Sequence, residues 1–333
     1  MTASRTVRRR LVFVLAIAGV FSASTLPALA APQSSAPAPG GPGAASDPAR
    51  TEGPQSYVVQ TPGAGQTGRW FDNLSLFVGP DGSKQPQDLG INANMGIRFS
   101  GNIGFPLLER AGIGAQIGAA LNLSDAAVHV LDQVEGTSRR TQTYLTLGVF
   151  QRASEKWNWA VAYDVLVQQY YDDFKLAQWR GQLGYAVTPR NEVGLWVAKS
   201  AKGDDGLMAD TPVRLDPISQ INGYTRITWT NLAQTAVWVG MASHHNNVVW
   251  VFPDNSKDDH VLVYGADLYV PLNERFGLQG AANFLTPTAT GTVDAYLGVV
   301  FYPGRGAFRA VRNAFAPLQT VANNPSFSVN LRR

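Results

Sequence analysis

Apolar and polar residues alternate with a period of two along most of the chain. In the stretch KWNWAVAYDVLVQQYYDD (156–173), Trp157 and Val161 fall on one face of this alternation, and Asn158 and Asp164 fall on the other. Successive side chains of a β-strand point to opposite faces, so this period predicts a strand. The run is about three times as long as the usual strand of roughly 5–6 residues. Its length raises the question of whether the apolar face meets a protein core or lipid.

About a dozen alternating runs follow one another between residues 69 and 303, and the connections between them alternate in length. RASEK, TPRN, TNLA and PLNE are short, whereas PDGSKQPQD, SDAAVHVLDQVEGTS, AKGDDGLMADTPVRLDP and HHNNVVWVFPDNSKDD are long. Two connections depart from this rule, since the turn near residue 172 is short and NIGFPLLERA (102–111) is long. Outer-membrane barrels have short periplasmic turns and longer external loops. The pattern therefore predicts an all-β fold, an up-and-down antiparallel transmembrane β-barrel of about 12 strands.

The composition of the polar face of these runs indicates that the opposite, apolar face contacts lipid. It consists mainly of Gly, Asn, Gln and Thr with few charges, whereas the water-facing side of a soluble sheet is usually rich in Lys and Glu. From Trp159 to Tyr171 the chain advances ~40 Å at ~3.3 Å per residue, which at a ~45° tilt projects to roughly 28 Å, close to the ~25 Å apolar band of such barrels. We expect Trp157 and Trp159 in the inner aromatic girdle and Tyr170 and Tyr171 in the outer one. The alternative is a large soluble β-sandwich or propeller with these rings in its core.

The N-terminus has the features of a secretory signal peptide over residues 1–30. Four arginines precede the apolar run LVFVLAIAGVF (11–21), which is too short to span a bilayer as a helix, and ALA (28–30) fits a cleavage site. Residues 31–68 are rich in Pro, Gly, Ala and Ser and predict a flexible tether. We expect export through this signal to place the barrel in the outer membrane, in contact with its lipid.

Composition narrows the chemistry. The first 30 residues hold four of the 27 basic residues and no acidic one, so 23 basic residues face 24 acidic residues in the mature chain. This balance gives no basis for nucleic-acid binding. The chain has no Cys, which excludes disulfides and thiolate metal sites. A GxSxG motif, a P-loop and a GxGxxG opening a helix are absent, so we expect no cofactor and no enzymatic activity.

Five segments carry a resemblance that extends over roughly residues 70–331. They are FDNLSLFVGPDGSKQPQDLGINANMG (71–96), GIGAQIGAALNLS (112–124), TYLTLGVFQRA (143–153), YDVLVQQYYDDFKLAQWRGQLGY (163–185) and APLQTVANNPSFSVNL (316–331). Together they resemble an uncharacterised family of exported β-barrel proteins found in planctomycete bacteria. The resemblance implies an outer-membrane-type barrel and implies no activity. The chain departs from ordinary outer-membrane barrels because FYPG (301–304) is followed by a basic tail rather than ending the chain.

Charged and polar side chains on the predicted lumen face form a candidate constriction. A hairpin centred on Asp172 sets Asp164 opposite Arg180, and opposite charges across a strand pair stabilise it. The pair either selects permeants at a constriction or is a structural ion pair that fills the lumen. The further lumen candidates are Arg98, Gln182, Arg226, Asp267 and Asp294.

Two loops hold oxygen and nitrogen ligands without the spacing of a metal site. The candidates for Zn²⁺ or another divalent ion in one long connection are His244, His245, Asp258 and His260. Adjacent ligands rarely converge and no i,i+4 spacing supports them, so we interpret the region as a solvated loop and assign no metal. A second loop carries carboxylates of the kind that Ca²⁺ takes, without the EF-hand spacing: Asp204, Asp205 and Asp210.

The C-terminal segment 304–333 is basic and contains no acidic residue. Phe327, Val329 and Leu331 alternate with polar residues, which is typical of a strand. Three interpretations remain open for this segment. It plugs the lumen, it lies in the periplasm with its arginines on anionic cell-wall polymers, or it is a disordered basic end.

These alternatives lead to three candidate functions. The first is a passive, porin-like pore for small polar solutes. The second is a structural or surface-adhesion barrel with a filled lumen and no transport. The third is a metal-dependent barrel hydrolase that uses the His/Asp loop. A lumen open to water favours the first function, and a lumen filled by side chains or by the tail favours the second.

Overall fold

The computed structural model of the protein describes residues 71–88, 93–128, 139–154, 156–208, 210–243, 261–286 and 292–332. The predicted signal peptide and tether lie outside the described residues, as do the metal candidates His244, His245, Asp258 and His260. Within the described part of the chain, no helix is long and apolar enough to cross a membrane.

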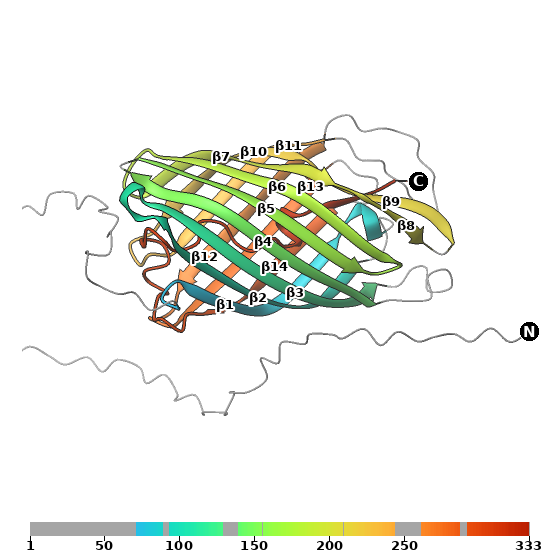
Figure 1. The fold of residues 1–333 in the computed structure, drawn as a ribbon, viewed down its shortest axis with the longest axis horizontal. Coiled ribbons are helices and arrows are strands. Elements are labelled where there is room, and N and C mark those ends of the chain that lie inside the picture. The colour runs from blue at the N-terminus through green and yellow to red at the C-terminus, as the bar shows by residue number, and fades with distance from the viewer. Residues whose placement is uncertain are drawn as a thin grey trace, which may run out of the picture. The chain divides into compact units, whose positions relative to one another are not determined.

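Twelve antiparallel strands close into one barrel, which confirms the predicted fold (Figure 1). Neighbours in the chain are neighbours in the barrel, and β1 pairs with β14 to complete the ring. Closure gives every strand two partners, so the sheet has no free edge. The strands are β1 (Leu74–Lys84), β2 (Ala93–Leu108), β3 (Ile113–Val128), β4 (Arg139–Ser154), β5 (Trp157–Gln169), β6 (Asp173–Ala186), β7 (Asn191–Lys202), β10 (Gln220–Thr228), β11 (Gln234–Ala242), β12 (Val261–Pro271), β13 (Phe276–Thr286) and β14 (Thr292–Phe301).

The two ends of the barrel differ in their connections. The short-turn end holds the connections after β4, β6, β10 and β12, together with η2 (Glu109–Ala111) between β2 and β3. The expected long connection at 102–111 is therefore mostly strand, because β2 continues to Leu108. The long-loop end holds η1 (Pro86–Asp88) and the long connection between β7 and β10. This asymmetry is that of outer-membrane barrels.

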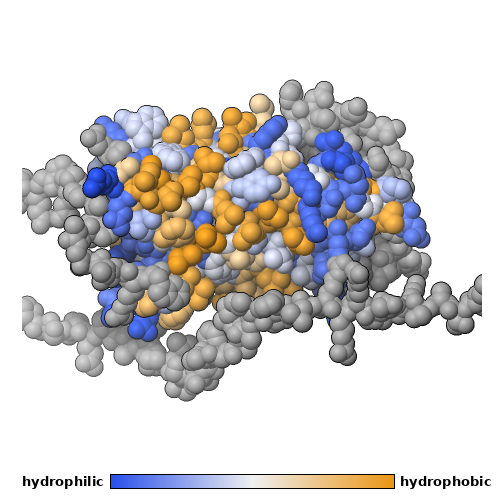
Figure 2. All heavy atoms as spheres, viewed as in Figure 1, coloured by the Kyte–Doolittle hydropathy of each residue, from blue (hydrophilic) through white to orange (hydrophobic). Residues whose placement is uncertain are grey.

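On the side of the barrel that Figure 2 shows, the outer face is apolar along its middle, with hydrophilic residues toward both ends. Large exposed apolar side chains come from β2 to β7 and from β10 to β14, and they include Leu147, Leu195 and Val239. A soluble monomer rarely exposes a contiguous apolar patch larger than about 300–600 Å². A belt carried by this many strands is the surface of a barrel that faces lipid.

Aromatic side chains mark the outer face at the short-turn end. Trp157 is exposed, its ring centroid lies 4.8 Å from that of Tyr185, and Trp159 is half-buried nearby. The expected outer girdle of Tyr170 and Tyr171 is wrong. Tyr170 is buried because its even position continues the lumen face of β5, and Tyr171 packs against an apolar cluster inside the barrel.

A small sheet lies at the long-loop end, in the order β15-β9-β8. The hairpin of β8 (Asp204–Met208) and β9 (Thr211–Pro217) fills the connection between β7 and β10, and Asp210 turns it with a φ of 64°. β15 (Val329–Arg332) pairs with β9. Because β14 ends at the short-turn end, the C-terminal segment crosses the length of the barrel before it reaches β9 (Figure 1).

Candidate functional site

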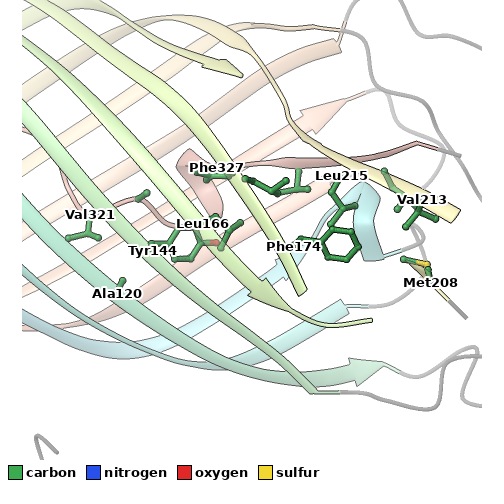
Figure 3. Packing of buried hydrophobic residues seen from close by; sticks show 13 residues of the cluster. Ala120, Tyr144, Leu166, Phe174, Met208, Val213, Leu215, Val321 and Phe327 are labelled. Carbon is green, nitrogen blue, oxygen red and sulfur yellow. The ribbon is translucent and has the colours of Figure 1, made fainter. Parts of the chain in front are cut away.

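The C-terminal segment occupies the lumen of the barrel. Residues 311–332, called the plug below, pass along the inner wall, where Val321 and Phe327 lie beside Tyr144 and Leu166 (Figure 3). Most of the plug beyond residue 320 is buried. Among the described residues, β15 is the part of the plug that belongs to a sheet. The backbone groups of the remainder therefore need other hydrogen-bond partners, which come from turns within the segment and from the wall.

Amide and hydroxyl side chains of the wall supply such partners. Gln116 of β3 makes two bonds with the backbone of Gln319, since its Nε2 donates to the carbonyl at 3.0 Å and its Oε1 accepts the N–H at 3.2 Å. Asn102 of β2 donates to the same carbonyl at 2.9 Å. The hydroxyl of Thr146 accepts the N–H of Ala322 at 2.9 Å. These residues fix the plug against one side of the barrel.

Two buried arginines donate to carbonyls of the plug. Arg98 Nη2 lies 2.9 Å from the oxygen of Ala322 and 3.3 Å from that of Val321. Arg180 Nη2 lies 2.9 Å from the oxygen of Thr320. Hydrogen bonds from an ionised donor are roughly twice as strong as neutral ones. Arg98 and Arg180, both predicted lumen residues, are thus bonded to the chain's own backbone.

Asp164 orients Arg180. The carboxylate accepts from Arg180 Nε at 2.5 Å and Nη2 at 3.0 Å, and also from Thr146 at 2.8 Å and Gln178 at 3.1 Å. The predicted register is wrong, because the hairpin centres on Tyr171 and places Gln178 directly opposite Asp164. Asp164 and Arg180 meet diagonally, since both still point into the lumen. The pair positions a donor for the plug.

The plug enters between Arg152 and Gly104. Arg152 Nε donates to the carbonyl of Ala316 at 2.8 Å, and its Nη2 donates to that of Pro317 at 2.6 Å. A Cβ at Gly104 would lie 2.2 Å from the carbonyl oxygen of Phe315. Glycine at this position lets the backbone of the plug approach the wall.

A group of hydrogen-bonded polar side chains binds the middle of the plug. Asn324 Nδ2 donates to Asp81 at 2.6 Å, and the hydroxyl of Tyr144 donates to Asn324 Oδ1 at 2.8 Å. Asn323 and Ser326 form a capping box around the short 3₁₀ helix η3 (Asn324–Ser326). The bend that η3 introduces turns the chain toward β9.

The last part of the plug packs into an apolar cluster at the long-loop end (Figure 3). Phe327 is fully buried, and its ring centroid lies 5.9 Å from that of Tyr144. The cluster joins side chains of the wall, the hairpin and the plug: Leu166, Phe174, Leu176, Met208, Val213, Leu215, Phe327, Val329 and Leu331. A dry core therefore fills this end of the lumen.

The loop between β1 and β2 folds inward and adds a second ion pair. Asp88 Oδ1 lies 2.9 Å from Arg140 Nη1 and 2.7 Å from Asn94 Nδ2. Burial raises the pKa of the Asp88 carboxyl, and the Arg140 guanidinium opposes that shift. Gln85 links the loop to the wall, because its Nε2 donates to Asp294 at 3.0 Å, and to the plug, because its Oε1 accepts the N–H of Val329 at 3.1 Å. Asp294, a predicted lumen residue, thus supports the loop.

The opposite wall carries a separate polar group. Arg226 Nη1 lies 3.0 Å from Glu192 Oε1, which also accepts the hydroxyl of Tyr224 at 2.5 Å. Gln182 donates to that hydroxyl at 3.2 Å, and Asp267 lines the same part of the lumen. Glu192 is the partner that the sequence reading missed for Arg226. Its even position in β7 was the signal that could have placed it inward.

The carboxylates of the hairpin β8–β9 pair with a basic residue. Arg214 Nη1 lies 3.0 Å from Asp205 Oδ2, and its Nε lies 3.2 Å from Asp216. Asp216 and Asp205 raise the pKa of Arg214. Asp204 accepts the N–H of Lys175 at 2.8 Å. In the part of the chain that the structure describes, no group of three or more His, Cys, Asp or Glu side chains is arranged to hold a metal ion.

The fold and the lumen define a class of protein, a membrane-type β-barrel that encloses its own C-terminal segment. Residues 73–329 match DUF6666, a family of unknown function, and the chain belongs to that family. The predicted resemblance to an uncharacterised family is confirmed at this level, and the planctomycete origin stays a prediction.

Comparisons with curated proteins and with solved structures add no functional assignment to the family match. No curated protein matches the chain. Similar solved structures include the KdgM porin, at 10% identity over 68% of this chain and 98% of that chain with a TM-score of 0.37. Outer membrane phospholipase A from Escherichia coli is 9% identical over 68% and 95%, with a TM-score of 0.37. LpxR from Salmonella typhimurium is 10% identical over 68% and 99%, with a TM-score of 0.38.

Proposed function

We propose that the protein is an outer-membrane barrel that its own C-terminal segment closes, with a structural or surface-adhesion role and no constitutive transport. The observation that carries this proposal is the plug, which the wall bonds at Gln319, Thr320, Val321 and Ala322. A wall of Gln, Asn, Thr and Arg also suits a water-filled pore. Here these side chains satisfy the backbone of an irregular segment.

The strength of these bonds makes spontaneous opening rare. A hydrogen bond to a charged group contributes about 1.5–3 kcal/mol net. At the lower value, Arg98 and Arg180 together stabilise the closed state by ~3 kcal/mol, which lowers the open fraction by a factor of about 100. The apolar cluster around Phe327 lowers this fraction further, because release of the plug exposes that side chain to water.

The predicted signal peptide and the apolar outer belt support a location in the outer membrane. With the short-turn end in the periplasm, the long-loop end and β15 face the outside. The surface role then belongs to the hairpin β8–β9, β15 and the long connections. Two exposed arginines near the start of the tail, Arg305 and Arg309, contact anionic cell-wall polymers in this proposal. The proposal includes no enzymatic activity.

A pore for small polar solutes is the second candidate. The observation that favours it is one-sided attachment, since the described bonds from barrel strands to the plug come from β1, β2, β3, β4 and β6. The wall of β7 and β10 to β13 makes no such described bond and lines a cavity beside the plug, together with parts of β1, β2, β4, β6 and β14. In this candidate, the plug moves aside and solutes pass along that wall.

Single-channel conductance in a planar bilayer separates the two candidates. We expect no steps from the refolded full-length mature protein, and steps after deletion of residues 304–333 or in the double variant Arg98→Ala/Arg180→Ala. The matched control is Arg190→Ala/Arg275→Ala, because these arginines are exposed in short turns. Reproducible steps from the full-length protein would overturn the closed barrel and support the pore. Silence from every folded variant would remove the pore candidate.

A further inference from the structure

A cavity of about 270 Å³ lies in the lumen beside the plug. Its lining reaches from Arg309 near the short-turn end to Pro325 and Ser326 in the plug. Its volume is close to the lower limit of small-molecule sites, which measure about 300–1,000 Å³. The bonds that hold the plug leave this space unused.

The strand register places small side chains beside the polar residues that line the cavity. Ala236 of β11 lies opposite Arg226 of β10 on one side and opposite Asp267 of β12 on the other. Asp267 in turn lies opposite Ala281 of β13. Inward side chains fill small barrels, so a row in which alanines flank the polar residues leaves room for a ligand.

Five arginines and two aspartates line the cavity: Arg98, Arg152, Arg180, Arg226, Arg309, Asp72 and Asp267. Arg226 is paired with Glu192 and Arg180 with Asp164, and the other three arginines donate to backbone carbonyls. Each guanidinium therefore already has a partner, and an anion would also meet Asp267. A hydroxyl group both donates and accepts hydrogen bonds. Guanidinium, carboxylate and amide groups in one cavity therefore suit a neutral ligand with many hydroxyls.

Aromatic rings line the same space. Trp196 and Trp238 lie with their ring centroids 6.0 Å apart and their planes at 83°. Tyr224 and Tyr269 also face the cavity. Aromatic side chains offer large apolar faces with a polar edge. Such faces pack against the C–H side of a sugar ring while polar neighbours bind its hydroxyls.

Trp238 bounds the cavity toward the long-loop end. Trp238 packs there against a buried apolar cluster of Ile218, Ala242, Val261, Val263 and Leu285. Access is from the short-turn end, where Asp72 and Arg309 line the cavity. The cavity, called the pocket below, is therefore bounded on its long-loop side by Trp238 and this cluster.

We propose that this pocket binds a neutral hexose or a short neutral oligosaccharide that enters from the short-turn end. Arg226, Asp267 and Gln279 bond to its hydroxyls, and Trp196 and Trp238 pack against its ring. The pocket depends on the position of the plug beside it and not on whether the plug opens.

Tryptophan fluorescence of the full-length protein in detergent, titrated with maltose, tests the proposal. Ala236→Leu fills the pocket, and Ala266→Leu is the matched control because Ala266 precedes Asp267 in β12 and is exposed on the outer face. We expect a saturable change in the wild type and in Ala266→Leu, and at least ~10-fold weaker binding in Ala236→Leu and in Asp267→Asn. Heat-modifiable gel migration verifies that each variant is folded.

Three results would overturn the proposal. The first is no saturable change in the wild type up to ~10 mM maltose, which corresponds to binding weaker than about 3 kcal/mol. The second is equal affinity in folded Ala236→Leu and in the wild type. The third is tighter binding of phosphate or spermidine than of maltose, which would assign the pocket to a charged ligand. Because the readout is binding, none of these results depends on the conductance of the barrel.

Discussion

Removal of the Asp164 carboxylate tests whether the buried ion pair supports the plug. In Asp164→Ala, the guanidinium of Arg180, which is 6% exposed, loses two bonds, and Thr146 and Gln178 each lose one. Removal of one partner of a buried pair costs about 3–5 kcal/mol, because it leaves an uncompensated charge. We expect the free energy of unfolding to fall by that amount.

The assay is urea unfolding in detergent micelles, followed by tryptophan fluorescence. Limited proteolysis at the C-terminal segment reports release of the plug. Asp205→Ala is the matched control, because Asp205 is 76% exposed in its pair with Arg214, and exposed pairs contribute about 0–1 kcal/mol. The double variant Asp164→Leu/Arg180→Met removes both charges. It should cost about 1–3 kcal/mol, mainly because the carbonyl of Thr320 loses its donor.

Two outcomes would refute this reasoning. One is a loss of less than ~1 kcal/mol in Asp164→Ala, which would make the buried pair equivalent to a surface pair. The other is a double variant that costs as much as the sum of the single variants Asp164→Leu and Arg180→Met, which would mean that the two side chains do not act as a pair.

Three further predictions concern the route of the plug. Gly104→Ala should destabilise the barrel by about 1–3 kcal/mol in urea unfolding, because the new methyl group overpacks against the plug backbone. The control Gly101→Ala should be near neutral, because its Cβ would meet only the end of a leucine side chain at 3.3 Å. An equal effect of both variants would contradict the plug contact. Phe327→Ala should lower the free energy of unfolding by about 3–5 kcal/mol and speed proteolysis of the C-terminal segment. The control Phe308→Ala should leave the proteolysis rate unchanged, because Phe308 is 38% exposed. Equal proteolysis rates in both variants would count against a packed plug. An epitope tag at the C-terminus should be labelled by antibody on intact cells, and labelling that requires permeabilised cells would place the long-loop end inside.

The sequence by itself determined the barrel, because the alternation of inward and outward side chains is a local property of each strand. Each strand shows its face through the parity of its positions, so Asp164 and Arg180 fall inward from the alternation alone. The same parity places Tyr170 and Glu192 inward, so the expected outer girdle is wrong at Tyr170. The turn was predicted to centre on Asp172, but it centres on Tyr171. The residue types of the turn do not distinguish two adjacent centres.

Only the tertiary structure decided where the C-terminal segment lies. The alternation of Phe327 and Val329 suits a strand in any apolar surrounding, and amide or hydroxyl side chains on a lumen wall suit water as well as a peptide backbone. The bond between Asn102 and Gln319 joins positions 217 residues apart. Such a contact leaves no periodic signal in the chain, because the partner of each backbone group is chosen by the packing of the whole lumen.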